Sequence, residues 1–429
     1  MRRLLPARLL CGSPLAAQAP RPPALDAIRA TDIRRDVDFL AGDYFRGREA
    51  GSPDELRASM WIATQLQAIG RKPAGEDGTF FQWFPMRRIR LADNSRIAID
   101  GTALTLWKDA TVSTTSDASL DLPILFVGAG LDSDLAGKDL TGKAVAAILG
   151  PAVNAPERTG GVPIARRESF ALTTQARSLI EQGAAAVIFV ADSDASAAIP
   201  FLIASHSRGL YALGSNEPVN PRARVVAPVI LANLRALDKV RSGSRLELRL
   251  STESFTYPSV NILGVIPGTG PVLKNEYALF SLHQDHDGVR GAIDGDSIYN
   301  GTDDNTSVTA GLFAIARAWA KKPGNRSARF IWHGGEERGL LGSRWHAEHS
   351  LVPEGWYFRS DHLPYARAGV PALMDSTLLH ADHHTPRDEP SRIDAQKLAR
   401  MAQWMYATGW YVSETRERPG ADPGLKRER

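Results

Sequence analysis

The chain has 429 residues, of which 43% are hydrophobic and 23% charged, and its formal net charge is only +3. Its basic residues are scattered rather than gathered into runs, so nothing indicates a nucleic-acid-binding protein. The length exceeds what one hydrophobic core usually supports, and we therefore expect two domains or one domain with a large insertion. No apolar run approaches the roughly 20 residues of a membrane span, so no such span is predicted.

The first 22 residues have the features of a signal peptide: a basic start, a leucine-rich stretch and small residues ending at Ala17-Gln18-Ala19. We predict that they direct export; the alternative is an N-terminal extension without that role. The single cysteine, Cys11, lies inside this segment. A mature chain without cysteine has no disulfide and no thiolate ligand, so any metal must be held by His, Asp or Glu.

The next segment predicts the entry to a domain, with helices at 32–40 and 53–69 and a strand near 80–84. From residue 119 the pattern changes to short apolar runs separated by proline and glycine. We interpret residues 119–234 as a separate β-rich module inserted into the chain.

After residue 249 predicted strands alternate with long helices. The strands are expected at 260–265, 277–282, 329–332 and 371–374, and the helices at 306–321, 340–349 and 394–411. This alternation predicts an α/β fold with a mixed, mostly parallel sheet flanked by helices, and ligands at the carboxyl ends of its strands. The main domain then comprises residues 23–118 and 235–413, and the tail 414–429 is predicted to be disordered.

Histidines concentrate in the last third of the chain, because all of the ten except His206 lie at or after position 283. His283 ends an apolar strand, and Asp285 follows two residues later. An aspartate at this spacing can accept the second ring N–H of the histidine and raise its basicity toward a metal. A surface turn explains such a triplet equally well.

Three further segments carry chemistry. The paired aspartates ending at Asp304 precede an apolar helix, where a carboxylate either bridges two cations or simply caps the helix. Glu336-Glu337 leave a buried strand between glycines, which suits one glutamate that binds metal and a neighbour that moves protons. In His383-His384 adjacent side chains diverge, so one is expected to bind metal and the other to line the pocket, unless the loop is simply a surface loop.

Five segments, SLHQDHDG, SIYNGTDDNTS, WHGGEERGLLGS, YFRSDHLPYARAGVPAL and HADHHTPRDEP, occur in this order. Together they resemble the co-catalytic zinc peptidases of metallopeptidase family twenty-eight, which includes bacterial secreted aminopeptidases, glutamate carboxypeptidases and glutaminyl cyclases. The opening segment DVDFLAGDYFRGREAGSP is also similar. Residues 119–234 resemble the protease-associated domain that many members carry as an insertion. The resemblance implies the zinc exopeptidase fold for the rest of the mature chain.

The same resemblance implies roles for individual residues. The implied metal ligands are His283, Asp304, Glu337 and His384. Asp304 resembles the carboxylate that bridges two zinc ions, with Glu337 and His384 completing one site and His283 belonging to the other. Glu336 resembles the general base, and Asp285 the partner of His283. The implied reaction is hydrolysis of a terminal bond in peptide substrates, in which zinc polarises the carbonyl and Glu336 passes a proton to the leaving amine.

The sequence departs from this family between Glu337 and His384. The family normally has a further strand there, ending in an Asn-x-Asp-Met-like motif whose aspartate joins the histidine of the second zinc. Here only HAEHSLVPEGWYF separates the helix at 340–349 from the segment of Asp361. The second metal then keeps two protein ligands where three are usual. Asp361 or Glu354 is an alternative ligand in place of the missing aspartate.

We therefore expect an exported zinc aminopeptidase with one well-formed and one incomplete metal site, and with activity impaired by the missing ligand. A carboxypeptidase or dipeptidase is an alternative, because the motifs are shared among these enzymes. A catalytically weak descendant that binds peptides is another. The oligomeric state and the preferred substrate side chain remain open.

Overall fold

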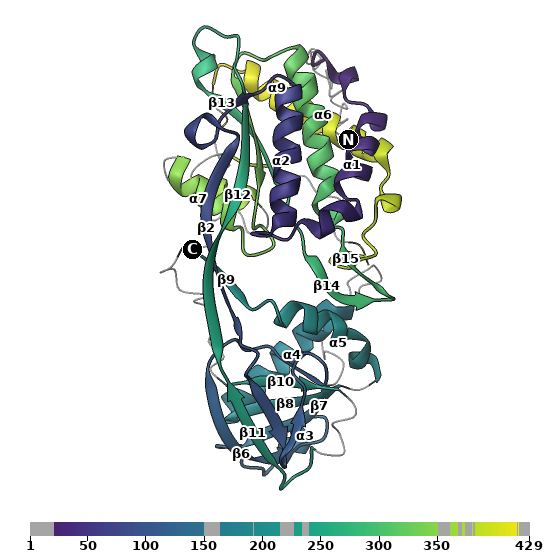
Figure 1. The fold of residues 1–429 in the computed structure, drawn as a ribbon, viewed down its shortest axis with the longest axis vertical. Helices are drawn as coiled ribbons and strands as arrows, with labels where there is room; N and C mark the ends of the chain where they lie inside the picture. Colours follow the sequence, from purple (N-terminus) through teal and green to yellow (C-terminus); the bar gives the residue numbers. More distant parts are fainter. Residues whose placement is uncertain are drawn as a thin grey trace, which may run out of the picture.

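The computed structural model describes residues 21–149, 164–191, 193–214, 227–233, 240–350, 361–367, 371–373, 380, 382–417 and 419. They form two parts, each with its own sheet, joined by a long two-stranded ribbon (Figure 1). Nearly all of the predicted signal peptide, most of the predicted tail and Glu354 lie outside these residues. None of the helices in the described ranges is both long and apolar enough for a membrane span.

The first sheet carries the strands on which the sequence analysis placed the chemistry. Its strands are β1 (Lys72–Pro73), β2 (Phe81–Leu91), β9 (Leu210–Leu213), β12 (Thr252–Ile266), β13 (Tyr277–His283) and β16 (Ser327–His333). Their order is β13-β16-β12-β2-β9, with β1 on β12. The predicted mixed sheet is confirmed, but only β13 and β16 are parallel among its described strands. The other pairs are antiparallel, including β2 with β12, which run against each other as one ribbon, and β12 with β16.

Helices cover both faces of this sheet, as predicted. They are α1 (Ala30–Leu40), α2 (Pro53–Ala68), α6 (Ser307–Lys321), α7 (Leu341–Ser350), α8 (His362–Arg367) and α9 (Ala395–Glu414). Alternate strand residues divide between the two faces. Phe280, Phe330 and Trp332 pack under α1, α2, α6 and α9, whereas Ile331 packs against Tyr365 of α8 on the opposite face.

The predicted helices begin and end close to where the structure has them, because local signals mark their ends. Ser52 caps α2 by accepting a hydrogen bond from the backbone N–H of Glu55 at 3.2 Å, and Pro53 takes the first helical position. Asp394 caps α9 in the same way. The strand predicted at 371–374 is not formed at residues 371–373, and its last residue lies outside the described ranges.

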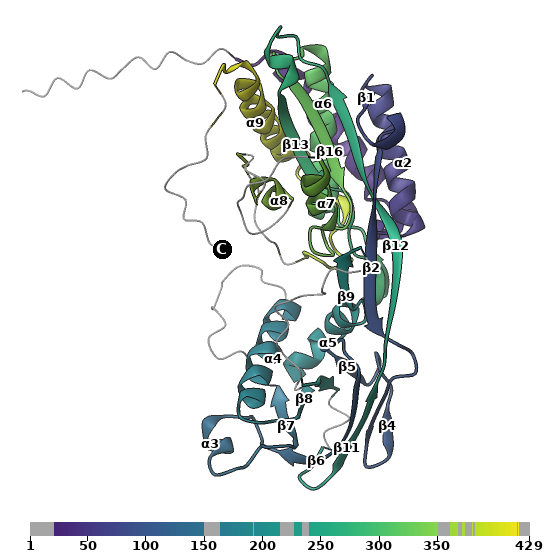
Figure 2. The same ribbon diagram turned by 90° about the vertical axis from the view of Figure 1, so that its left-hand side faces the viewer.

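The ribbon of β2 and β12 carries the chain between the two parts. Its pairing runs from Phe81 opposite Ile262 to Leu91 opposite Thr252. Figure 2 shows both strands passing from the first sheet toward the second. A pair of short strands, β14 (Gly288–Ile293) and β15 (Asp296–Tyr299), projects from the first part toward the second part near α5.

The second part is built around an eight-stranded sheet with the order β4-β3-β11-β6-β7-β8-β10-β5. Its strands are β3 (Arg96–Ile99), β4 (Thr102–Leu104), β5 (Ala110–Val112), β6 (Ala118–Phe126), β7 (Ala144–Leu149), β8 (Ala186–Ala191), β10 (Val229–Ala232) and β11 (Arg245–Leu250). Its helices are α3 (Asp132–Leu135), α4 (Ile164–Glu181) and α5 (Ser193–His206). The sheet thus draws strands from both sides of residues 119–234, and β9 from within that range pairs with β2 of the first sheet.

Candidate metal centre

Four of the predicted site segments meet at one edge of the first sheet. His283 ends β13, and β16 beside it ends at His333, just before Gly334 and the two glutamates. Asp304 lies in the turn of residues Thr302–Thr306 that leads into α6. His384 lies in the loop before α9. Because β13 and β16 are parallel, the loops that follow them leave on the same edge, as expected for an α/β ligand site.

Asp304 lies at the centre of this group. Its Oδ1 is 3.1 Å from Nε2 of His283, and its Oδ2 is 3.4 Å from Nε2 of His384. His383 also reaches it, with Nδ1 3.2 Å from Oδ2. Both adjacent histidines therefore face the same carboxylate.

Glu337 joins the group from the end of β16. Its Oε2 is 3.3 Å from Nε2 of His384, and its Oε1 is 2.9 Å from Nδ1 of His286, a residue that the sequence analysis did not single out. Within the described part of the chain, three sets of side chains offer ligand atoms that lie within 4.8 Å of one another. They are Asp304 with His383 and His384, His283 with Asp304 and Glu337, and Asp287 with Glu337 and His384.

Glu336 points toward the other side of the group, with Oε2 3.9 Å from Nε2 of His283. Burial raises the pKa of Glu336 to about 8, with the His283 imidazolium opposing the shift. The backbone N–H of Glu336 donates to Oδ1 of Asp285 at 3.1 Å. Glu336 is thus a partly buried carboxylate beside His283 whose proton affinity suits proton transfer near neutral pH.

Asp285 holds His283 differently from the sequence prediction. Nδ1 of His283 is 3.1 Å from the backbone carbonyl oxygen of Asp285, whereas the nearest carboxylate oxygen is 3.8 Å away. The carbonyl accepts the ring N–H, and the carboxylate instead holds the backbone of Glu336. Asp285 therefore fixes the tautomer of His283, as predicted, but it does so through its main-chain carbonyl group.

The charges of the cluster suit a bound cation. Burial alone would raise the pKa of Asp304, but hydrogen bonds from His283 and His384 hold this pKa well below its usual range. Burial lowers the pKa of each imidazole, yet neighbouring carboxylates raise the pKa of both rings well above the ordinary value. In the metal-free protein two imidazolium groups therefore supply positive charge among the carboxylates, which a divalent cation with N and O ligands can replace.

Asp361 supports the same conclusion from the side of His283. Its side chain is buried, and no hydrogen bond from a described residue reaches either carboxylate oxygen within ordinary distance. The hydroxyl group of nearby Ser343 donates to the carbonyl of Leu340 at 3.2 Å. Burial raises the pKa of Asp361 well above its usual range, and Glu336 adds to the shift while His283 and the nearby Ser343 hydroxyl group oppose it. Buried carboxylate oxygens without partners beside imidazole and carboxylate groups fit a site for a cation.

Arg48 fixes two of the site loops, and the sequence analysis did not detect this role. Its guanidinium group is fully buried and donates to the carbonyl oxygens of Gln284 at 2.8 Å, Asn300 at 2.8 Å and Gly301 at 3.0 Å. The loops after β13 and before α6 are therefore tied together directly behind His283 and Asp304. The similarity of the opening segment DVDFLAGDYFRGREAGSP was the only signal for it.

Asp388 and Asp287 support the other side of the site. Asp388 accepts hydrogen bonds from the backbone N–H groups of Asp303, at 2.9 Å, and Asp304, at 3.3 Å, and so holds the turn that carries Asp304. Asp287 lies 3.1 Å from Nδ1 of His384 through Oδ2 and 3.2 Å from Nη1 of Arg338 through Oδ1. These contacts orient the loop of Asp304 and the ring of His384.

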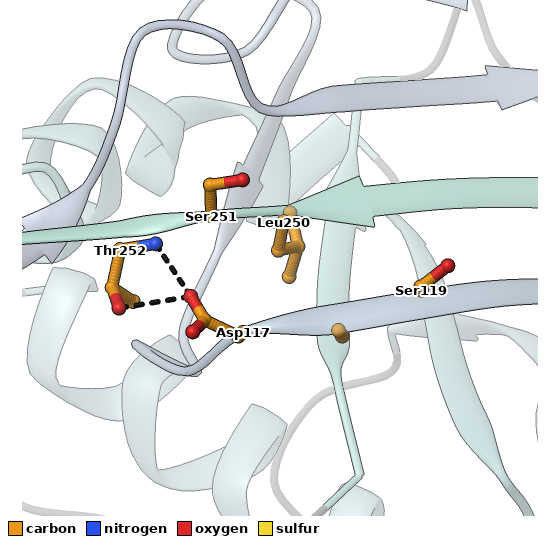
Figure 3. Close-up of a pocket in the computed structure, with 6 residues that line it drawn as sticks. Asp117, Ser119, Leu250, Ser251 and Thr252 are labelled. Atoms are coloured by element: carbon orange, nitrogen blue, oxygen red, sulfur yellow. Dashed lines mark hydrogen bonds between the residues drawn. The ribbon is translucent and has the colours of Figure 1, made fainter.

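A second depression lies far from this cluster, where β6 meets the junction of β11 and β12 (Figure 3). Asp117, Ser119 and Thr252 line part of it. The Asp117 carboxylate accepts hydrogen bonds from the backbone N–H of Thr252 at 2.6 Å and from its hydroxyl group at 2.9 Å. No histidine is among the lining residues, so this depression does not compete with the cluster as a metal site.

Comparisons with known proteins point to the same chemistry. Residues 261–354 and 347–409 match the model of Peptidase family M28, and these two stretches contain every residue of the cluster. No curated protein matches the chain. The family match and the fold identify the chain as a hydrolase of the metallopeptidase class.

Solved structures show the fold along nearly the whole chain. An aminopeptidase from Aneurinibacillus sp. strain AM-1 superposes with a TM-score of 0.54 at 19% identity, covering 93% of this chain and 96% of that chain. A zinc aminopeptidase from Bacillus subtilis gives a TM-score of 0.55 at 17% identity, with 90% and 96% covered. A Peptidase M28 precursor from Shewanella amazonensis gives 0.50 at 14% identity, with 93% and 97% covered. At these identities the likeness concerns the fold.

Proposed function

We propose that the chain is an exported zinc-dependent aminopeptidase that releases N-terminal residues from peptides. The observation that carries the proposal is the convergence of His283, Glu337 and His384 on the half-buried carboxylate of Asp304, with Glu336 beside them. Two structural neighbours described as aminopeptidases support the choice within the metallopeptidases. The features of the N-terminal sequence support export.

The residues would divide into one complete and one incomplete zinc site. Asp304, Glu337 and His384 would supply three ligands, because Nε2 of His384 lies 3.4 Å from Asp304 and 3.3 Å from Glu337. Three ligands are the usual protein contribution to a catalytic zinc site. On the other side His283 would have a share of Asp304. Among the described residues the third side chain grouped with these two is Glu337, which is already assigned to the first site, and not Asp361. When bound, zinc supplies a Lewis acid that activates water and polarises the scissile carbonyl.

The chain's own residues then account for the proton transfer. Glu336 lies within the site, is mostly buried, with 17% of its side chain exposed, and is not held by a cationic partner at hydrogen-bond distance among the described residues. It takes the proton of the attacking water and delivers it to the leaving amine. Asp285 fixes the backbone of Glu336, and the carbonyl of Asp285 fixes the ring of His283.

The proposed loss of the fifth ligand is supported by the form of the family match. The match consists of two stretches that overlap at residues 347–354 rather than one continuous stretch. The overlap falls where the sequence analysis places the missing strand and its aspartate. We propose that this loss weakens the second site and lowers the activity.

The function is tested with purified protein, zinc and small substrates. Hydrolysis of aminoacyl chromogenic substrates that requires zinc is expected. Dipeptides blocked at the carboxyl end should be cleaved, and dipeptides blocked at the amino end should not. The reverse preference would identify a carboxypeptidase, and zinc binding without turnover of either set would identify a peptide-binding descendant.

A further inference from the structure

Arg208 links the second part of the molecule to the metal centre. It follows α5, whose last residue is His206, and precedes β9, which leaves the second part and pairs with β2. Gly209 makes this approach possible, because its φ is +74° and a Cβ there would lie 2.0 Å from the carbonyl oxygen of Ile89. Nε of Arg88 donates to the carbonyl of Arg208 at 2.7 Å. The backbone of Arg208 is thus fixed against β2.

The side chain of Arg208 forms an ion pair with Oδ1 of Asp287. Both partners are withdrawn from solvent, with 15% of the Arg208 side chain and 2% of the Asp287 side chain exposed. Arg338 binds the same carboxylate oxygen at 3.2 Å. The other oxygen of Asp287, Oδ2, is 3.1 Å from Nδ1 of His384. Only one carboxylate therefore separates Arg208 from a proposed zinc ligand.

A carboxylate that accepts the second ring N–H of a ligating histidine fixes the ring and raises its basicity toward the metal. Such a carboxylate must stay ionised and correctly oriented although it is buried, which requires cationic partners. The two arginines hold one oxygen of Asp287 and leave the other for His384. Arg338 comes from the glutamate loop itself, whereas Arg208 comes from a distant segment of the chain.

We infer that Arg208 is a positioning residue of the metal centre, which holds Asp287 so that Asp287 orients His384. The inference rests on the proposed zinc site of Asp304, Glu337 and His384. If so, the segment between α5 and β9 supplies one of the side chains that hold Asp287, and thereby His384, in the metal centre of the first part. A role of Arg208 confined to holding β9 on the sheet is the competing explanation.

The test measures zinc affinity of the full chain by competition with a chromogenic chelator. Arg208→Met should weaken zinc binding about 10-fold or more, as is typical when a group that orients a ligand is lost. Arg208→Lys, which keeps the charge, should recover much of the affinity. The matched control is Arg245→Met, whose ion pair with Asp121 lies in the second part on the surface, and it should bind zinc as the wild type does.

The double variant separates positioning from a purely structural role. If Arg208 acts through Asp287, then Asp287→Asn should weaken zinc binding to a similar extent, and adding Arg208→Met to it should cause no further loss. The inference would be overturned if the losses of zinc affinity in the two single variants multiplied in the double variant. It would also be overturned if Arg208→Met bound zinc with unchanged affinity. If Arg208→Met does not fold, Asp287→Asn decides, because wild-type affinity in that variant is incompatible with the inference.

The same measurements separate this inference from the proposed function. Wild-type protein that binds no zinc contradicts the zinc site itself. Wild-type protein that binds zinc tightly, with Arg208 variants that bind equally tightly, contradicts only the role of Arg208.

Discussion

The two sides of the metal centre differ in how completely their buried charges are paired. On the side of His384, Asp287 contacts two arginines and the histidine, and Glu337 contacts both His286 and His384. On the side of His283, the carboxylate of Asp361 has no hydrogen-bond donor at ordinary distance in the described ranges, and the nearest nitrogen of His283 lies 3.9 Å from Glu336. Unpaired buried carboxylates destabilise a folded chain.

The proposed loss of a strand beside this shared site accounts for the difference. His283 keeps its place because β13 pairs with β16, whereas the proposal leaves its ligand set one carboxylate short. The set on the opposite side has its own supporting network. Metal affinity should therefore be distributed unequally between the two sides.

The largest effect is expected from the two adjacent glutamates. Glu336→Gln removes the proposed proton carrier and should reduce turnover by about 100-fold or more, while zinc content stays at the wild-type value. Glu337→Gln removes a proposed ligand and should lower zinc content as well as turnover. Zinc analysis of both purified variants after dialysis checks the pair. Equal loss of zinc in the two variants would mean that the roles are misassigned.

The adjacent histidines provide the next comparison. Both rings face Asp304, but only His384 also lies within 3.3 Å of Glu337 and is oriented by Asp287. We expect His384→Ala to lose the tight zinc ion and His383→Ala to retain it, with activity reduced only a few-fold. Zinc affinity measured for both variants decides between them, and the opposite ranking would make His383 the ligand.

The sequence allowed prediction of those site residues that lie directly at the end of a strand or the start of a helix. His283, Asp304 and Glu337 follow strands or precede a helix whose patterns are local, so their position at one sheet edge could be inferred. The spacing of His283 and Asp285 did not reveal that the carbonyl of Asp285, rather than its carboxylate, accepts the ring N–H of His283. Both groups belong to the same residue, so the sequence does not distinguish them.

The supporting residues could not be inferred in this way. Arg48 contacts a site loop more than two hundred residues away in the sequence, and Arg208 contacts one about eighty residues away. Both are arginines, which usually lie on the surface, so their sequence context does not indicate a buried role. Likewise, the pattern of residues 119–234 indicates a β-rich module but does not show that β9 returns to the first sheet. Long-range pairing leaves no periodic signal in a short window.

Zinc removal tests the inequality of the two sites directly. After dialysis against a chelator and stepwise return of zinc, we expect one equivalent per chain to bind tightly and a second to bind weakly or not at all. A site with two protein ligands should lose well over the roughly 10–100-fold in affinity that follows loss of a supporting group. Two equivalents retained with similar affinity would show that another carboxylate completes the second site.

The smallest effect, and the most specific to the side of His283, is expected for Asp361→Asn in the metal-free protein. Burial and the charge of Glu336 raise the pKa of Asp361 well above its ordinary value, with His283 opposing. The folded chain therefore binds this proton more tightly than the unfolded chain, so its contribution to stability is complete below a pH of about 4 and is lost as the pH rises through the folded pKa. Asparagine does not ionise, and the variant should gain stability relative to the wild type as the pH increases, by about 1–3 kcal/mol at pH 8.

Urea unfolding of both proteins with chelator present, at pH 5 and pH 8, measures this gain. Asp121→Asn, which changes a carboxylate that is 54% exposed, is the control and should shift stability by less than about 0.5 kcal/mol at either pH.

A variant at Asp361 that is less stable than the wild type at pH 8 would mean that the carboxylate has a partner in the folded chain. If the variant also binds fewer zinc equivalents than the wild type, that partner is the metal, because an asparagine side chain is a poor substitute for a carboxylate ligand. Asp361 would then be the ligand that replaces the missing aspartate, and the two sides of the centre would be equivalent once zinc is bound.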